Sequence, residues 1–127
     1  MKQHFPTNLP LPASSAVRAG DYVFVSGHMP FDENKMLVQG SIEVQTRVVL
    51  EAIKATLKRA GCEMSDIVKN TIWLQDPRDF NGYNRVYAEY FPTNPPARAT
   101  VQAMLMEEAR IEIDSIAYKP LGDAGKK

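Results

Sequence analysis

Cysteine and histidine are scarce in this 127-residue chain, which has one cysteine, Cys62, and two histidines, His4 and His28. A single cysteine excludes an intrachain disulfide and a cysteine-rich metal cluster. Transition-metal sites are built mostly from several His and Cys side chains, so two histidines argue against such a site. No acidic segment has the spacing of a calcium-binding loop. We therefore predict that the protein holds no metal.

Long apolar runs and an excess of charge of one sign are also missing. No stretch approaches the roughly 18–20 apolar residues that cross a bilayer, and residues 1–12 lack the apolar region of a signal peptide. Fifteen Lys and Arg balance fifteen Asp and Glu, so nothing attracts the chain over long range to nucleic acid or anionic lipid. We expect a cytoplasmic protein that binds neither nucleic acid nor membranes.

The composition that is present is typical of one globular domain. The sequence is 44% hydrophobic and 9% aromatic, and about 100–150 residues is the usual size of a domain. Common catalytic motifs such as G-x-S-x-G, the P-loop and G-x-G-x-x-G do not occur. We predict a single domain over residues 1–127. Its first part, 1–12, is expected to be an extended arm because of its three prolines, and 119–127 is expected to be a flexible tail.

Hydrophobic periodicity predicts two helices. Between residues 42 and 60 apolar side chains recur at helical spacing, with Ser41 suited to the N-cap and Gly61 to the C-terminal stop. Aromatic and aliphatic residues from 80 to 91 repeat in the same way, with Asp79 as the expected N-cap. Pro92 ends this second helix because proline cannot continue it.

Five strands are expected around these helices. Residues 17–25 contain a turn signal between two short β-forming runs, which predicts a hairpin, and the segments 66–74, 98–103 and 111–118 predict three further strands. The order is ββ-α-β-α-ββ. It indicates an α+β fold in which two helices pack on one face of a single mixed sheet.

Alternation along the strands assigns side chains to faces of this sheet. We predict that the face opposite the helices carries Trp73, Arg98, Thr100, Gln102, Glu112 and Asp114. Such a face is neither plainly apolar nor plainly solvated, and another subunit often covers a face of this kind. We therefore expect the protein to form oligomers.

Two side chains in the last strands are candidates for chemistry. Arg98 follows two prolines that hold the backbone from which its guanidinium extends, and arginine suits bidentate recognition of a carboxylate. Glu112 lies between two isoleucines, where loss of water would raise the pKa of its carboxyl group and suit a general acid or base. On these grounds alone, a solvated surface arginine and a solvent-facing carboxylate stay open as alternatives.

Cys62 and His28 are weaker candidates. Cys62 follows the C-terminal end of the first predicted helix, where the helix dipole does not lower the pKa of a thiol, so a partly buried thiol is expected. His28 stands where a predicted strand ends, after Ser26 and Gly27. It could line a pocket, and a polar loop histidine fits the pattern equally well.

Several segments between residues 14 and 118 follow one another in a characteristic order. They are Ser26-Gly27-His28-Met29-Pro30, Gln45-Thr46-Arg47, Gly61-Cys62, Asn84-Arg85-Val86-Tyr87 with Phe91, Pro96-Ala97-Arg98-Ala99-Thr100-Val101 and Ile111-Glu112-Ile113-Asp114-Ser115-Ile116-Ala117. Together they resemble the RidA/YjgF family of reactive intermediate deaminases. The resemblance implies a chorismate-mutase-like (YjgF-like) fold, a homotrimer with clefts between subunits, and hydrolysis of enamines and imines such as 2-aminoacrylate to 2-keto acids and ammonia without a cofactor.

The resemblance also implies roles for individual residues. Arg98 would hold the substrate carboxylate, and Glu112 would position and activate the attacking water. The implied substrate-binding residues are Ser26, Gly27, Asn84, Arg98 and Thr100. Of these, Gly27 and Thr100 would act mainly through their backbones, with Asn84 and Ser26 in support.

Three departures from the family pattern leave alternatives open. Small residues at 13–14 stand near a position where many active deaminases have an aromatic residue, Thr100 stands where cysteine is frequent, and residues 102–106 are unusually rich in Met. A pathway-specific deaminase of another imine or enamine therefore stays open, as does a non-enzymatic trimer that binds small metabolites. A ribonuclease or translation regulator is disfavoured by the neutral charge.

Overall fold

The computed structural model describes residues 2–122, in which six strands and two α-helices form two layers. The helices are α1 (Ile42–Arg59) and α2 (Phe80–Tyr90). Two short 3-10 turns, η1 (Met64–Asp66) and η2 (Pro77–Asp79), precede β4 and α2. The strands are β1 (Lys2–Pro6), β2 (Ser14–Ala19), β3 (Tyr22–His28), β4 (Ile67–Leu74), β5 (Ala97–Gln102) and β6 (Ile111–Tyr118).

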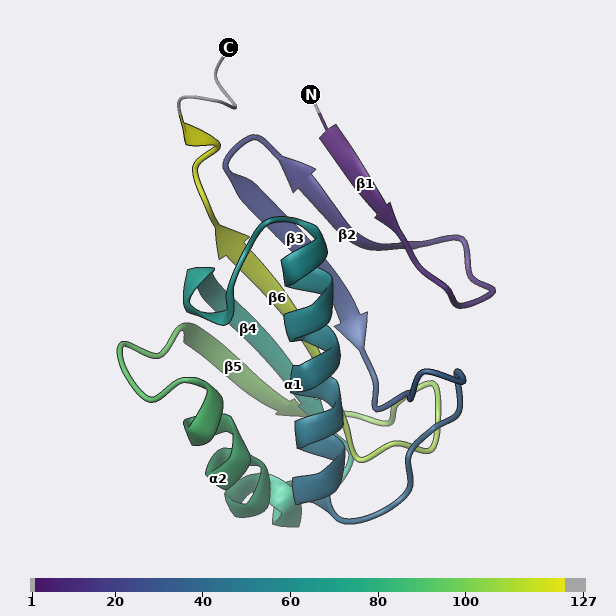
Figure 1. Ribbon diagram of the computed structural model, residues 1–127. Coiled ribbons are helices and arrows are strands. Elements are labelled where there is room, and N and C mark those ends of the chain that lie inside the picture. The colour runs from purple at the N-terminus through teal and green to yellow at the C-terminus, as the bar shows by residue number, and fades with distance from the viewer. Residues whose placement is uncertain (1, 123–127) are drawn as a thin grey trace.

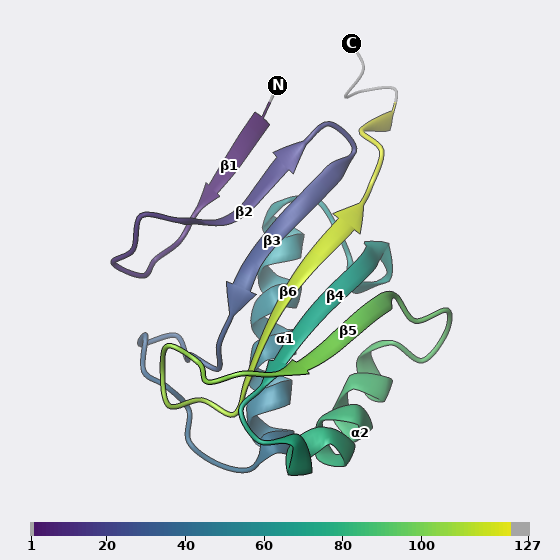
Figure 2. The same cartoon turned by 180° about the vertical axis from the view of Figure 1, so that it is seen from behind.

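The strands form one sheet in the order β1-β2-β3-β6-β4-β5. Neighbouring strands are antiparallel except β4 and β5, which are parallel. Both helices lie across the same face of the sheet (Figure 1), and the opposite face carries no helix (Figure 2). The predicted fold class, two helices on one face of a single mixed sheet, is confirmed.

The predicted strand order omitted β1. This strand lies within the segment expected to be an extended arm and pairs with β2 at the edge of the sheet. An edge strand tolerates prolines because one row of its backbone N–H groups has no partner strand. The tail predicted over 119–127 lies, from residue 123 on, outside the described residues.

Both helix starts were predicted, and one cap differs. The Ser41 side chain accepts a hydrogen bond from the backbone N–H of Val44, as expected of an N-cap. Asp79 precedes α2 but caps no N–H group, and its carboxylate instead accepts from Arg110 at 3.1 Å. The residues just before α2 already form η2, so Asp79 has a helical backbone and its side chain cannot turn back to the helix end.

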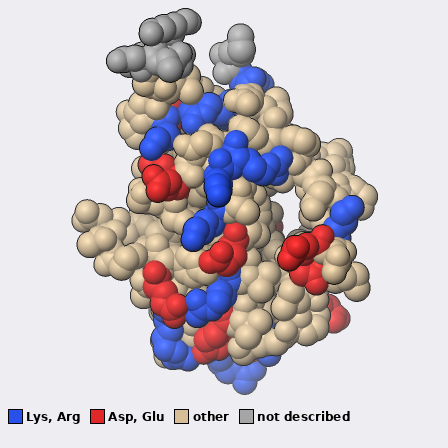
Figure 3. Space-filling view, in the orientation of Figure 1, with Lys and Arg blue, Asp and Glu red and all other residues tan. Residues whose placement is uncertain are grey.

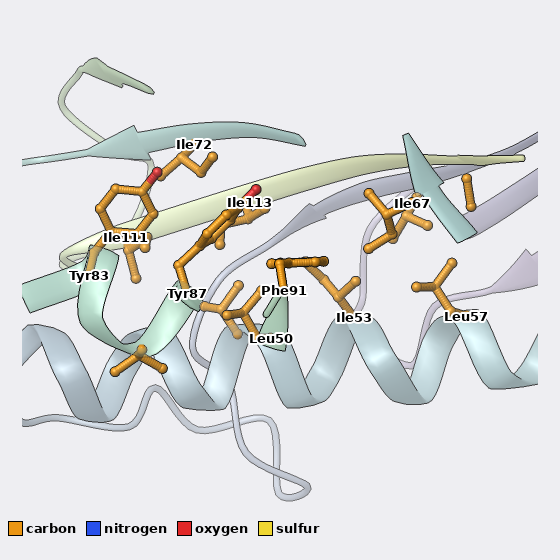
Figure 4. Packing of buried hydrophobic residues seen from close by; sticks show 14 of the residues in the cluster. Leu50, Ile53, Leu57, Ile67, Ile72, Tyr83, Tyr87, Phe91, Ile111 and Ile113 are labelled. Atoms are coloured by element: carbon orange, nitrogen blue, oxygen red, sulfur yellow. The ribbon is translucent and has the colours of Figure 1, made fainter. Parts of the chain in front are cut away.

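The core lies between the helices and the sheet. Aliphatic side chains of α1 pack toward β4 and β6, and the Tyr83 and Tyr87 rings extend into the same layer from α2 (Figure 4). Burial of each large apolar side chain contributes about 1.5–3 kcal/mol. Both polar atoms of the buried Asn70 side chain have a partner, since Oδ1 accepts from Ser115 at 2.5 Å and Nδ2 donates to the Tyr87 hydroxyl at 3.0 Å.

Strand β5 contradicts the predicted assignment of faces. It pairs in parallel with β4 so that Arg98 lies beside Asn70 and Thr100 beside Ile72. Asn70 and Ile72 are buried under the helices. Arg98, Thr100 and Gln102 therefore point to the helix side of the sheet, not to the opposite face.

The other half of that prediction is correct. Trp73 pairs with Glu112 and Thr71 with Asp114, and these side chains point to the helix-free face. The error arose because apolar side chains in a strand usually mark the core side. In β5, an edge strand, Val101 points the other way and is 44% exposed. Tyr22, Phe24 and Tyr118 are similarly exposed on the same helix-free face.

Candidate functional site

Arg98 is held against α2. Its Nη1 donates to the Tyr83 hydroxyl at 2.5 Å and to Asn84 Oδ1 at 2.7 Å. Its guanidinium carbon lies 5.2 Å from the Tyr83 ring centre and 5.0 Å from that of Tyr87, within the range of cation–π attraction. The structure thus brings together two of the residues implied by the family motifs, Arg98 and Asn84, with their neighbour Tyr83.

Thr100 joins the same group through Tyr83. The two hydroxyl oxygens are 2.8 Å apart. A guanidinium can only donate hydrogen bonds, so the Tyr83 oxygen accepts from Arg98, whereas either hydroxyl can be the donor between Tyr83 and Thr100. Burial raises the pKa of Tyr83, which keeps the phenol protonated at neutral pH. We call Arg98, Asn84, Thr100 and Tyr83 the arginine cluster.

Tyr83 was missed as a functional candidate because its spacing marked it as a core residue of the second helix. Its side chain is fully buried, which agrees with that assignment. A buried tyrosine nevertheless needs a partner for its hydroxyl group. That requirement, together with the adjacent Asn84, was the signal available in the sequence.

Glu112 lies on the other face of the sheet, beside Gly27. Its carboxylate is half-buried, and burial, followed by the nearby charge of Asp114, raises its pKa as predicted. Within residues 2–122 the carboxylate accepts no hydrogen bond from any side chain. A methyl group on Gly27 would overlap Glu112 Oε2, so the carboxylate can occupy this position only because residue 27 is glycine.

Ser26 and His28 hold the end of β3 on either side of Gly27. The Ser26 hydroxyl donates to the Ser14 carbonyl oxygen at 2.5 Å. The His28 Nδ1 lies 2.6 Å from the Ser26 carbonyl oxygen, and its Nε2 lies 3.0 Å from the Thr56 hydroxyl. A carbonyl only accepts, so Nδ1 carries the proton and Thr56 donates to Nε2. Burial lowers the pKa of His28, which favours this neutral form.

A groove opens beside Ser26, Gly27 and Glu112. It runs between α1 and the segment that joins β1 to β2, and His28 is part of its lining. Ala13 and Ser14 also line this groove. They are the small residues near the position where many active deaminases have an aromatic residue. We call Ser26, Gly27 and Glu112 the carboxylate cluster.

The two clusters do not meet within one chain. Arg98, Asn84 and Thr100 lie on the helix side of the edge strand β5, whereas the Glu112 side chain lies on the helix-free side of β6. Strand β4 separates these two strands. One chain therefore presents two separate groups of candidate residues.

Cys62 is buried, and burial raises the pKa of its thiol. This matches the prediction of an unreactive position after the first helix. Among the described residues, no three His, Cys, Asp or Glu side chains converge as metal ligands. None of the helices in residues 2–122 is long and apolar enough to span a membrane. On the face that carries the helices, basic and acidic side chains are intermixed (Figure 3).

Known proteins share this sequence and this fold. A family profile with the description Endoribonuclease L-PSP matches residues 10–119. The 3-aminoacrylate deaminase RutC of Acinetobacter baylyi is 46% identical over 109 residues, which cover 84% of this chain and 86% of that protein. The chain belongs to the Rid (YjgF, L-PSP) family.

Solved structures agree with this membership. A crystal structure of a Thermotoga maritima protein matches this Rid protein with a TM-score of 0.90 and 40% identity, covering 94% of this chain and 98% of that one. The Rid family protein YyfA of Yersinia pestis matches with a TM-score of 0.86 and 35% identity, covering 93% and 99%. The resemblance drawn from the sequence motifs is confirmed.

Proposed function

We propose that this Rid protein is a cofactor-free deaminase that hydrolyses enamine or imine carboxylates to keto acids and ammonia. An enamine first tautomerises to the imine, whose carbon is electrophilic. Water adds to that carbon, the carbon–nitrogen bond breaks, and the products are one carbonyl compound and one ammonia. In this scheme Arg98 holds the substrate carboxylate and Glu112 removes a proton from the attacking water.

The arginine cluster supports binding of an anion. Asn84 Oδ1 accepts from Arg98, and within residues 2–122 its amide NH₂ group donates to no other side chain or carbonyl oxygen. The remaining N–H groups of Arg98 are donors as well. A surface that offers several donors beside a fixed positive charge suits a carboxylate.

The unpartnered Glu112 carboxylate is the observation that carries the proposal. A structural carboxylate in a half-buried strand position would be expected to pair with a cation or backbone N–H. Glu112 has no such partner within the described residues, and burial raises its pKa toward the value that suits a general base. The groove beside it gives water and substrate a path to the carboxylate.

We further propose that the complete site forms between subunits of a homotrimer, with Arg98 from one subunit and Glu112 from a neighbour. The two clusters lie on opposite faces of one sheet, so a single chain cannot close around one small substrate. Aromatic side chains on the helix-free face, including Phe24 at 46% exposure, favour its burial against another copy.

The two candidate substrate classes differ in the distance between the carboxylate and the reacting carbon. In a 2-imino acid these carbons are adjacent, whereas in 3-aminoacrylate one carbon separates them. The relation to RutC supports a 3-amino substrate, and the family motifs support a 2-amino one. We propose the 2-aminoacrylate type as the first candidate, with 3-aminoacrylate as the alternative within the same reaction.

An RNA substrate is less favoured, although the family description names an endoribonuclease. Equal numbers of basic and acidic residues provide no electrostatic attraction to a phosphate backbone. On the helix-bearing face, the basic side chains in the upper half are interrupted by acidic side chains further down (Figure 3).

The test is release of ammonia from freshly generated 2-aminoacrylate, 2-aminocrotonate and 3-aminoacrylate, together with the matching carbonyl acid, which is a 2-keto acid for the first two substrates and 3-oxopropanoate for the third. We expect the wild-type protein to accelerate at least one of these hydrolyses and Glu112→Gln to lose that acceleration while folded. Failure of the wild type on every member of the panel would favour the non-enzymatic binding protein over the deaminase.

A further inference from the structure

We infer that Tyr83 is a positioning residue for the carboxylate-binding half-site, because its hydroxyl group links Arg98 and Thr100 in one chain of hydrogen bonds. The inference rests on the proposed function, since it takes Arg98 as the residue that binds the substrate carboxylate. It goes beyond that function because Tyr83 belongs to none of the motifs that suggested it. Tyr83 would act through Arg98, which it orients, without touching the reacting atoms.

The Tyr83 ring has little freedom to move. Its side chain is fully buried in the layer between α2 and the sheet (Figure 4). The rings of Phe80 and Tyr87 contact it edge-on, with centroid distances of 5.9 Å and 5.6 Å. The hydroxyl oxygen is therefore held at one point, and a group bound to it is held as well.

Arg98 depends on that point for its orientation. Within residues 2–122 its guanidinium donates to two side chains, Tyr83 and Asn84, and forms no ion pair with a carboxylate. Both bonds start from Nη1, so the remaining N–H groups stay available for a ligand. Removal of the phenol oxygen leaves a single anchor, and a long arginine side chain with one anchor samples more rotamers.

The Tyr83 hydroxyl also contacts Thr100. The two hydroxyl oxygens are 2.8 Å apart, and either can be the donor of the hydrogen bond. This bond gives the phenol a second partner beside Arg98, so the oxygen that anchors the guanidinium is itself held from the edge strand β5 as well as by the packing of its ring.

The experiment is a double-mutant cycle on binding of 2-oxobutanoate, a stable keto acid of the proposed product class, measured by isothermal titration calorimetry on the full-length protein. We expect Tyr83→Phe to weaken binding about tenfold, the effect of losing one hydrogen bond to a charged group. In the background of Arg98→Ala the same substitution should change the residual binding less than about twofold, because the residue through which Tyr83 acts is gone.

Tyr90→Phe is the matched control. It removes a tyrosine hydroxyl from the same helix, where the group donates to Glu51 Oε2 at 2.6 Å and makes no contact with Arg98. We expect this variant to bind 2-oxobutanoate like the wild type. In steady-state deamination Tyr83→Phe should raise KM more than it lowers kcat, a split that a general loss of stability would not produce.

The outcomes separate this inference from the proposed function. Wild-type affinity in Tyr83→Phe would overturn the positioning role while leaving the deaminase proposal intact. An equal loss with and without Arg98 would also overturn it, because Tyr83 would then act elsewhere. A wild type that binds 2-oxobutanoate through Arg98 and Tyr83 but releases no ammonia would support the inference and refute the deaminase. Absence of keto-acid binding in the wild type would overturn the inference, whatever the ammonia assay shows.

Discussion

A methyl group added at Gly27 is the sharpest test of where Glu112 operates. The new Cβ would overlap Glu112 Oε2 and would lie 3.2 Å from Cδ and 3.5 Å from Cγ of the same side chain. The three atoms nearest to the new Cβ all belong to the Glu112 side chain, so Gly27→Ala pushes first on this carboxylate. The backbone at residue 27 is not in the left-handed region, so alanine fits there without strain.

The expected cost in stability is small. Glu112 Oε2 is the far end of a flexible side chain, and turning it aside costs about 0.5–1.5 kcal/mol, the energy of an unfavourable rotamer. Replacing a glycine also removes freedom from the unfolded chain, which stabilises the protein by about 0.4–1 kcal/mol. The two effects nearly cancel, so the melting temperature should stay close to that of the wild type.

The expected cost in activity is large. The carboxylate must move by roughly an ångström to clear the methyl group, and a misplacement of that size costs about 100-fold in rate. Glu112→Gln, which keeps the shape and removes the base, should lower kcat by about 10²–10⁴. The measurement is kcat for ammonia release from the substrate that the panel identifies, with thermal melts on each variant.

The double variant Gly27→Ala with Glu112→Gln completes this test. If the methyl group acts by displacing the carboxylate, the double variant should be no slower than Glu112→Gln alone. Near-wild-type kcat in a folded Gly27→Ala protein would show that Glu112 does not work from this position. Multiplication of the two losses would show that Gly27 acts independently of Glu112.

Five further predictions concern the same site and its assembly. Arg98→Lys keeps the charge and loses the planar fork, so kcat/KM should fall roughly tenfold to a hundredfold, corresponding to about 1.5–3 kcal/mol; an unchanged value would remove Arg98 from substrate binding. Burial raises the pKa of Glu112 above its ordinary 4.5. As the pH is lowered, kcat/KM should therefore begin to fall at a higher pH than it would with a solvated glutamate as the base. A fall that begins only at or below pH about 4 would contradict this. The same raised pKa means that folding disfavours the ionised carboxylate, so wild type should gain stability relative to Glu112→Gln as pH falls through the raised pKa; thermal melts that show the opposite trend would refute the stated cause. Sedimentation equilibrium should report a trimer at micromolar concentration, whereas a monomer would eliminate the inter-subunit site. Chelators should leave the activity unchanged, and a loss of activity that is restored by adding metal would disprove this.

The amino-acid sequence alone indicated both helices, five of the six strands and the family. Ser41, the helical spacing after it and Gly61 act within a few residues of one another, so their effect can be read locally. The direction of the Glu112 pKa shift was predicted from its apolar neighbours, but Ile111 and Ile113 point to the opposite face of the sheet, so the burial that raises this pKa comes from the tertiary structure. The motifs around Arg98 and Glu112 were sufficient to indicate the Rid family.

Only the tertiary structure decided which residues share a surface. Alternation in β5 groups Arg98 with Thr100 but leaves open which side of the sheet that group takes, and the parallel register with β4 placed it under α2. Apolar alternation misleads at an edge strand, because the apolar side can be the one that lacks a helix. The role inferred for Tyr83 also depends on the tertiary structure. Arg98 and Thr100 lie 15 and 17 residues after Tyr83 in the chain, and only the packing of α2 against β5 brings its hydroxyl group to them.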